Sequence, residues 1–117
     1  MRPWFGVFGA PSAWAMQHVT GYALTEATCS EAAQSMGWDV HLDAWTVAIS
    51  AAAALVAVAS GIAALATYRA TRAAGEEPPA ARVRFLAVVG IAIVPLFLAM
   101  ILMSGLGVLF LDPCRQG

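Results

Sequence analysis

The sequence predicts an all-α integral membrane protein with three transmembrane helices. Of its 117 residues, 61% are hydrophobic and only 11% are charged, whereas soluble domains carry about 25% charged residues. A chain of this length buries too little of its own surface to hide so much apolar area from water. Lipid is therefore expected to be part of the solvent, and residues 1–117 are expected to form a single transmembrane domain.

The first expected helix, residues 4–28, is the least apolar of the three. It contains Gln17, His18 and Glu26. A cleaved signal peptide is the main alternative, with Arg2 as its basic start and the small residues before Cys29 as its end. Because Gln17 and His18 interrupt the apolar run that a signal peptide requires, a retained helix is the favoured interpretation.

The second and third expected helices cover residues 44–69 and 83–111. No charged residue occurs from 44 to 68 or from 85 to 111. Each segment exceeds the roughly 20 apolar residues that span a bilayer core, where only a helix can satisfy its own backbone. Glycine and two consecutive prolines interrupt the connection at 70–82, which is therefore expected to be a short polar loop.

The arginines predict the orientation. The chain contains arginine but no lysine. The arginines are Arg2, Arg69, Arg72, Arg82, Arg84 and Arg115. The connection at 29–43 contains none of them. With a cytoplasmic N-terminus, all except Arg115 lie inside, as the positive-inside rule favours. The use of arginine without lysine suggests a bacterial gene. The expected location is thus the bacterial inner membrane, crossed several times, with loop 70–82 cytoplasmic and loop 29–43 and the C-terminus periplasmic.

The two cysteines follow the first and third expected helices. Cys29 and Cys114 would both lie on the periplasmic side, where disulfides form and persist. We expect one disulfide that joins the first and third helices. The alternative is that both cysteines remain unpaired as small apolar residues.

Small residues along the second helix predict close helix packing. Such residues let backbones approach one another in lipid. The expected packing residues are Ala48, Ala52, Ala53, Ala57, Ser60 and Gly61. In the third helix, Pro95 removes a backbone donor, so a kink is expected near the middle of that helix.

A polar stripe runs along the first helix. Trp14, His18, Tyr22 and Glu26 recur every four residues and so share one face, with Gln17 beside them. Because polar groups are costly against lipid, this stripe is expected to face a protein partner. Two chemical alternatives remain for His18, as a haem or chlorophyll ligand and as a proton relay.

Neither catalysis nor metal binding is indicated by the motifs. The sequence has no catalytic pair, no glycine-rich phosphate loop and no paired metal ligands, so we expect no enzymatic activity, no cofactor and no metal. The net charge of −1 argues against nucleic-acid binding. The expected partners are lipids and the membrane subunits of a larger complex.

The chain contains the motif "FGAPSAWAMQHVTGYALTEATC", two apolar spans, "RFL" before the last span and a terminal "DPC". In these features it resembles a family of small, uncharacterised bacterial membrane proteins. That family is associated with gene clusters for haem-copper cytochrome c oxidases. The resemblance implies a respiratory context. Together with the small residues of the second helix and the polar stripe, it favours a non-catalytic accessory or assembly subunit of a respiratory complex or supercomplex in electron transport. Two alternatives are a periplasm-facing thiol redox protein or metallochaperone that uses Cys29 and Cys114, and an accessory subunit of a light-harvesting complex or photosystem.

Overall fold

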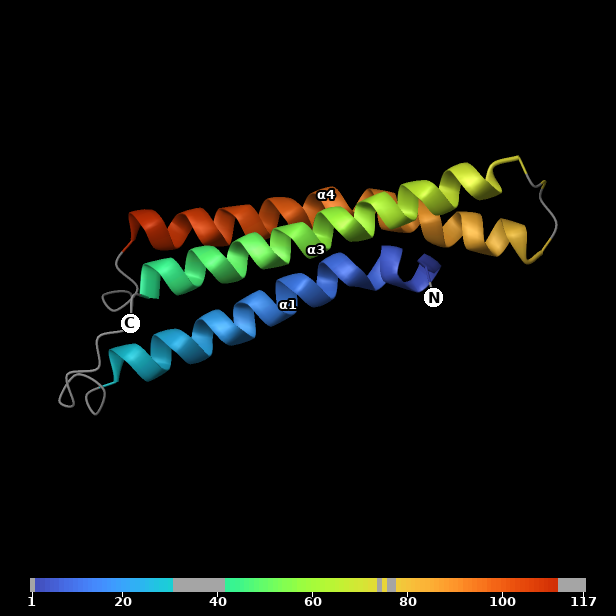
Figure 1. Ribbon diagram of the computed structural model, residues 1–117. Helices are drawn as coiled ribbons and strands as arrows, with labels where there is room; N and C mark the ends of the chain where they lie inside the picture. Colours follow the sequence, from blue (N-terminus) through green and yellow to red (C-terminus); the bar gives the residue numbers. More distant parts are fainter. Residues whose placement is uncertain (1, 31–41, 74, 76–77, 112–117) are drawn as a thin grey trace.

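The computed structural model describes residues 2–30, 42–73, 75 and 78–111. The described chain is all-helical, with α1 at Arg2–Cys29, α3 at Leu42–Thr71 and α4 at Ala80–Phe110 (Figure 1). The prediction of three helices is therefore confirmed for this part of the chain. Two of them, over Ala44–Thr71 and Ala80–Phe110, are long and apolar enough to cross a membrane.

The helix ends differ from the expected ones by up to three residues. α1 covers Arg2–Cys29, and Pro3 near its start gives up no intrahelical hydrogen bond there. α4 starts at Ala80, immediately after Pro79, and the amide of Val83 donates to the carbonyl oxygen of Pro79 at 3.1 Å. Gly75, with φ +77°, lies in the connection between α3 and α4, in the backbone region that favours glycine.

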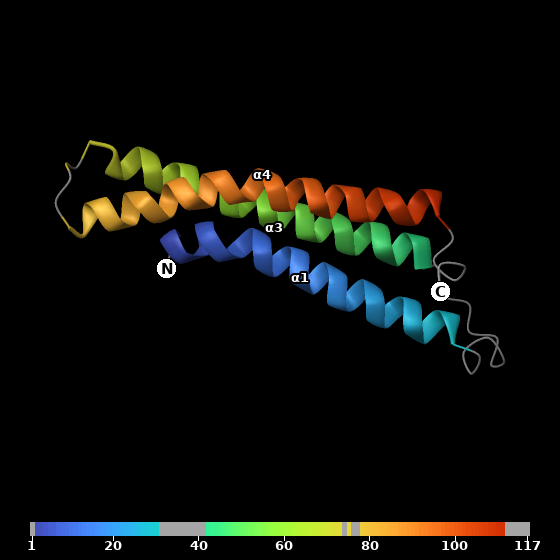
Figure 2. The same cartoon turned by 180° about the vertical axis from the view of Figure 1, so that it is seen from behind.

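α3 and α4 form an antiparallel hairpin, and α1 packs against both of its helices. Figures 1 and 2 show that α1 runs antiparallel to α3 and parallel to α4. Both views also show the tip of the hairpin, where α3 ends and α4 begins, extending past the N-terminus of α1. α1 therefore does not cover the tip.

The interior of the bundle is built from small residues. On α3 the buried positions alternate in steps of three and four, which keeps them on one face of a helix. These positions are Ser50, Ala53, Ala57, Ser60, Ala64 and Thr67. Of the expected packing residues, Ala48 and Ala52 are exposed in this chain. A strict four-residue step drifts about 40° per step from the 3.6-residue period, so Ala48 and Ala52 turn away from the interior.

Glycines allow the backbones to approach most closely near the N-terminus of α1. A Cβ added at Gly90 would lie 2.5 Å from the carbonyl oxygen of Gly6, and one at Gly9 would lie 2.6 Å from Cβ of Ser60. At the next position along α3, a Cβ added at Gly61 would lie 3.0 Å from Cγ1 of Val94 on α4. α1 is therefore fitted to the hairpin by backbone-to-backbone contact.

α4 continues as one helix from Ala80 to Phe110 through Pro95. Pro95 is exposed, so its ring points away from the other two helices. α1 likewise continues through Pro11. Each proline removes one backbone donor from its helix, but neither interrupts the helical run.

Candidate partner-binding face

Gln17 joins all three helices. Its side chain is 6% exposed, and Nε2 donates to Oγ of Ser50 on α3 at 2.8 Å and to the carbonyl oxygen of Ile101 on α4 at 3.2 Å. Because the carbonyl oxygen of Ile101 can only accept, the nitrogen of the amide must face it. Oε1 of Gln17 is buried without a donor among the described residues. Gln17 thus fixes the position of α1 along the hairpin.

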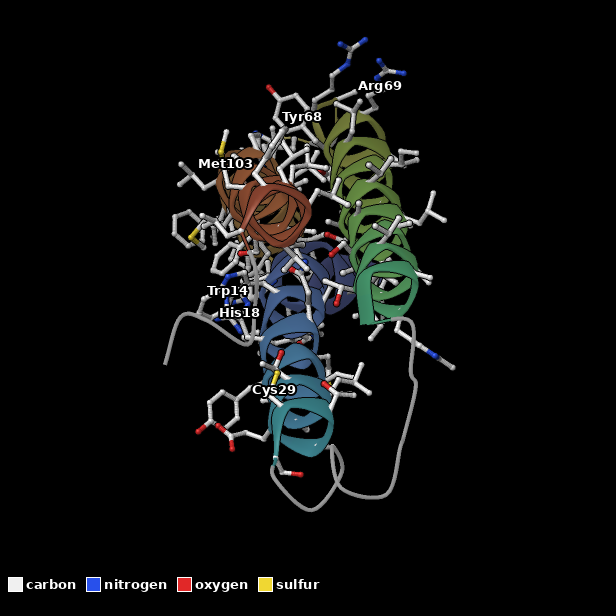
Figure 3. All side chains as sticks on the ribbon, turned by 90° about the vertical axis from the view of Figure 1, so that its left-hand side faces the viewer. Trp14, His18, Cys29, Tyr68, Arg69 and Met103 are labelled. Atoms are coloured by element: carbon white, nitrogen blue, oxygen red, sulfur yellow. The ribbon has the colours of Figure 1, made fainter. Side chains whose placement is uncertain are left out.

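Trp14 and His18 lie side by side between α1 and α4 (Figure 3). The ring centroids of Trp14 and His18 are 4.6 Å apart, and Trp14 meets Phe97 of α4 edge-on at 5.7 Å. Nδ1 of His18 lies 3.0 Å from the carbonyl oxygen of Trp14, so Nδ1 carries the hydrogen. Nε2 lies 3.5 Å from Oγ of Ser104, at the outer limit of a hydrogen bond.

The rest of the predicted stripe is exposed. His18 and Glu26 are exposed, and Tyr22 is 70% exposed. No hydrogen bond from the side chain of Tyr22 or Glu26 reaches another residue of the described chain. α1 therefore presents a polar face, formed by His18, Tyr22 and Glu26, beside its contact with α4. We call these three residues the outer stripe.

The stripe predicted from the sequence needs one correction. Gln17 does not face outward with the others, since both of its hydrogen-bond partners lie in this chain. Consecutive residues on a helix are separated by about 100°, so Gln17 turns inward while His18 turns outward. Trp14 is also partly covered by Phe97 of the same chain. The contacts of Trp14, Gln17 and His18 could not be found from the sequence, because they depend on the register between helices. These contacts are Ser50, Phe97, Ile101 and Ser104.

Cys29, the last residue of α1, is disulfide-bonded, whereas Cys114 lies outside the described residues. The register between α1 and α4 bears on their expected pairing. Gly6 meets Gly90, Gln17 meets Ile101 and His18 meets Ser104, so each α4 partner lies 84 to 86 positions later in the sequence. α1 and α4 run parallel, so the end of α1 at Cys29 and the end of α4 at Phe110 lie at the same end of the bundle. Pairing of Cys29 with Cys114 stays a prediction.

A groove of about 650 Å³ runs between α1 and α3, on a different side of α1 from the outer stripe. Trp4, Phe5, Phe8 and Met16 line it from α1, and Ile49 and Val56 line it from α3. Its lining is almost wholly apolar, so it is suited to hydrocarbon.

Within the described residues, no three His, Cys, Asp or Glu side chains come together to hold a metal ion. The arrangement seen here consists of one exposed imidazole, one phenol and one carboxylate on a helix face. Such a face suits hydrogen bonding to another protein surface.

Comparisons of the chain with protein-family models, with curated proteins and with solved structures give no match.

Proposed function

We propose that this protein is a non-catalytic accessory or assembly subunit of a bacterial respiratory membrane complex, one that contains a haem-copper cytochrome c oxidase. The association with an oxidase rests on the sequence resemblance. The outer stripe supports the more general part of the proposal, which is that α1 binds another membrane subunit.

The single observation that carries the proposal is the position of His18. His18 has an exposed ring and directly follows Gln17 in α1. Gln17 contacts Ser50 of α3 and Ile101 of α4, and both of these residues lie away from the ends of their apolar helices. At that depth, lipid tails offer no hydrogen-bond partner, and within the described chain Nε2 has only the contact with Oγ of Ser104 at 3.5 Å, at the outer limit of a hydrogen bond. An exposed polar ring with so weak a partner is costly. A helix of another subunit packed on this face would shield the ring and supply a polar partner.

The proposal places all three helices across the inner membrane, α1 included. The N-terminus and the α3–α4 connection lie in the cytoplasm, because four arginines lie in that connection or in the helix ends beside it. The connection between α1 and α3 then lies in the periplasm, together with Cys29 and the C-terminus, where a disulfide is stable.

Variants at His18 test this proposal. His18→Gln retains a donor and an acceptor, so the variant should stay with the complex with normal pigment content and turnover. His18→Leu should weaken association, because an interhelical hydrogen bond in lipid is worth about 1–2 kcal/mol in peptide systems. The measurement is the amount of variant that remains with the haem-containing subunits after purification in mild detergent.

Met16→Leu is the matched control, since Met16 is exposed on the groove side of α1. It should behave like the wild-type chain. If His18→Gln removes an absorption band, His18 is a pigment ligand. If it slows turnover in an intact complex, His18 takes part in proton transfer. Either result contradicts a role in subunit binding alone.

A further inference from the structure

The hairpin tip gathers most of the positive charge of the chain. Arg69 lies in the last turn of α3 and Arg72 directly follows that helix. Arg82 and Arg84 lie in the first turns of α4. The connection also contains Glu76 and Glu77, which lie outside the described residues, so segment 69–84 carries a net charge of +2.

One of the four arginines is used within the fold. Nη2 of Arg84 donates to the carbonyl oxygen of Thr71 at 2.8 Å and to that of Gly75 at 2.6 Å. These carbonyls are at and just beyond the C-terminus of α3, where the helix dipole favours a cation. Arg84 therefore ties the start of α4 to the end of α3 and holds the tip in one shape.

The other three arginines remain available. Arg69, Arg72 and Arg82 are exposed, and no described residue accepts a hydrogen bond from their guanidinium groups. Figure 3 shows Arg69 on the side of α3 away from α1. Their backbone is fixed, because Arg69 and Arg82 are helical and the amide of Arg72 donates to the carbonyl oxygen of Tyr68 at 2.9 Å. The tip thus presents three charged groups on a rigid support.

The position of these groups decides which anion meets them. The two helices long and apolar enough to cross a membrane end at this tip, so their ends lie at the level of the lipid headgroups. The tip extends past the N-terminus of α1, which leaves its flanks open to lipid (Figures 1 and 2). Phe85, 66% exposed, continues the apolar surface directly below the arginines. Guanidinium groups bind phosphate oxygens in a bidentate manner.

From this arrangement we infer that Arg69, Arg72 and Arg82 form a binding surface for the phosphate groups of anionic phospholipids. The lipid tails lie along the exposed apolar side chains of α3 and α4. The surface anchors the hairpin in the leaflet that is richer in anionic lipid. Because the inference concerns the isolated chain, it stands independently of the proposed respiratory partner.

Native mass spectrometry of the purified chain tests the inference, by titration with phosphatidylglycerol or with phosphatidylcholine of the same acyl chains. Each arginine near an anionic surface contributes about a fivefold increase in affinity. The wild-type chain should therefore bind phosphatidylglycerol at least about tenfold more tightly than phosphatidylcholine. The triple variant Arg69→Gln, Arg72→Gln, Arg82→Gln should lose that preference. High salt should also reduce the preference, because exposed charges are screened.

Arg115→Gln is the control, because it removes one positive charge at a residue far from the tip in the sequence and outside the described residues. It should leave the preference unchanged. Equal binding of the two lipids by the wild-type chain would overturn the inference. So would a triple variant that keeps its preference for phosphatidylglycerol. If the triple variant keeps its preference for phosphatidylglycerol but separates from the larger complex, the three arginines bind an acidic protein segment instead of lipid.

Discussion

Replacing Gly90 by alanine is expected to separate α1 from the hairpin. The added Cβ would lie 2.5 Å from the carbonyl oxygen of Gly6 and 3.0 Å from Cβ of Ala64. The first of these atoms belongs to the backbone of a helix, so no side-chain rotation relieves the clash. The two helices must move apart, and overpacking of this kind costs about 1–3 kcal/mol. We expect a loss of unfolding free energy in that range.

Unfolding by sodium dodecyl sulphate in mixed micelles, followed by circular dichroism, measures this loss. Gly107→Ala is the matched control, since it makes the same change on the same helix where no atom lies within 4 Å of the added Cβ. Its stability should stay equal or rise, because alanine favours a helix more than glycine does. Equal stability of the two variants would show that α1 and α4 do not meet at Gly6 and Gly90.

Replacing Cys29 by serine is expected to release the C-terminal end of α1. Cys29 is disulfide-bonded, and a link from Cys29 to Cys114 would close a loop of more than 80 residues. Disulfides typically contribute about 2–4 kcal/mol, more for longer loops. The variant should therefore lose stability in that range in the same unfolding experiment, and reduction of the wild-type chain should have the same effect.

Ser30→Ala is the control, because it alters the next residue without removing a sulfur atom. Digestion without reducing agent should give one linked peptide pair that contains Cys29 and Cys114. A membrane-impermeant thiol reagent should label the protein only after reduction. A Cys29–Cys29 link between two chains would overturn the predicted pairing. Rapid labelling before reduction would favour the interpretation as a thiol redox protein.

Much of the helical architecture can be predicted from the sequence, because a long, uncharged and apolar segment satisfies its own backbone hydrogen bonds as a helix. The segments at 44–69 and 83–111 are helical as expected, and their ends in the structure differ from the expected ones by one to three residues. Their ends also had local signals, since prolines precede α4 and charged residues follow the apolar part of α3. Whether a segment forms a helix, and where that helix ends, thus depends on the residues of that segment alone.

The helix register could not be predicted in the same way. Small residues occur all around α3, so composition did not distinguish Ala53 and Ala57, which are buried, from Ala48 and Ala52, which are exposed. The inward turn of Gln17 likewise depends on Ser50 and Ile101 of two other helices. Hydrophobic patterning selects a face poorly in such helices because both their buried and their exposed surfaces are apolar.

Purification at native expression level tests most directly whether this chain is a subunit of a larger respiratory complex. A tagged copy that replaces the chromosomal gene should be extracted in mild detergent and resolved by size, with the absorption spectrum of each fraction recorded. We predict that the chain elutes in a large assembly with haem-containing subunits whose spectrum includes a cytochrome oxidase. Elution of the chain alone, free of haem, under conditions in which the oxidase stays intact would contradict this account.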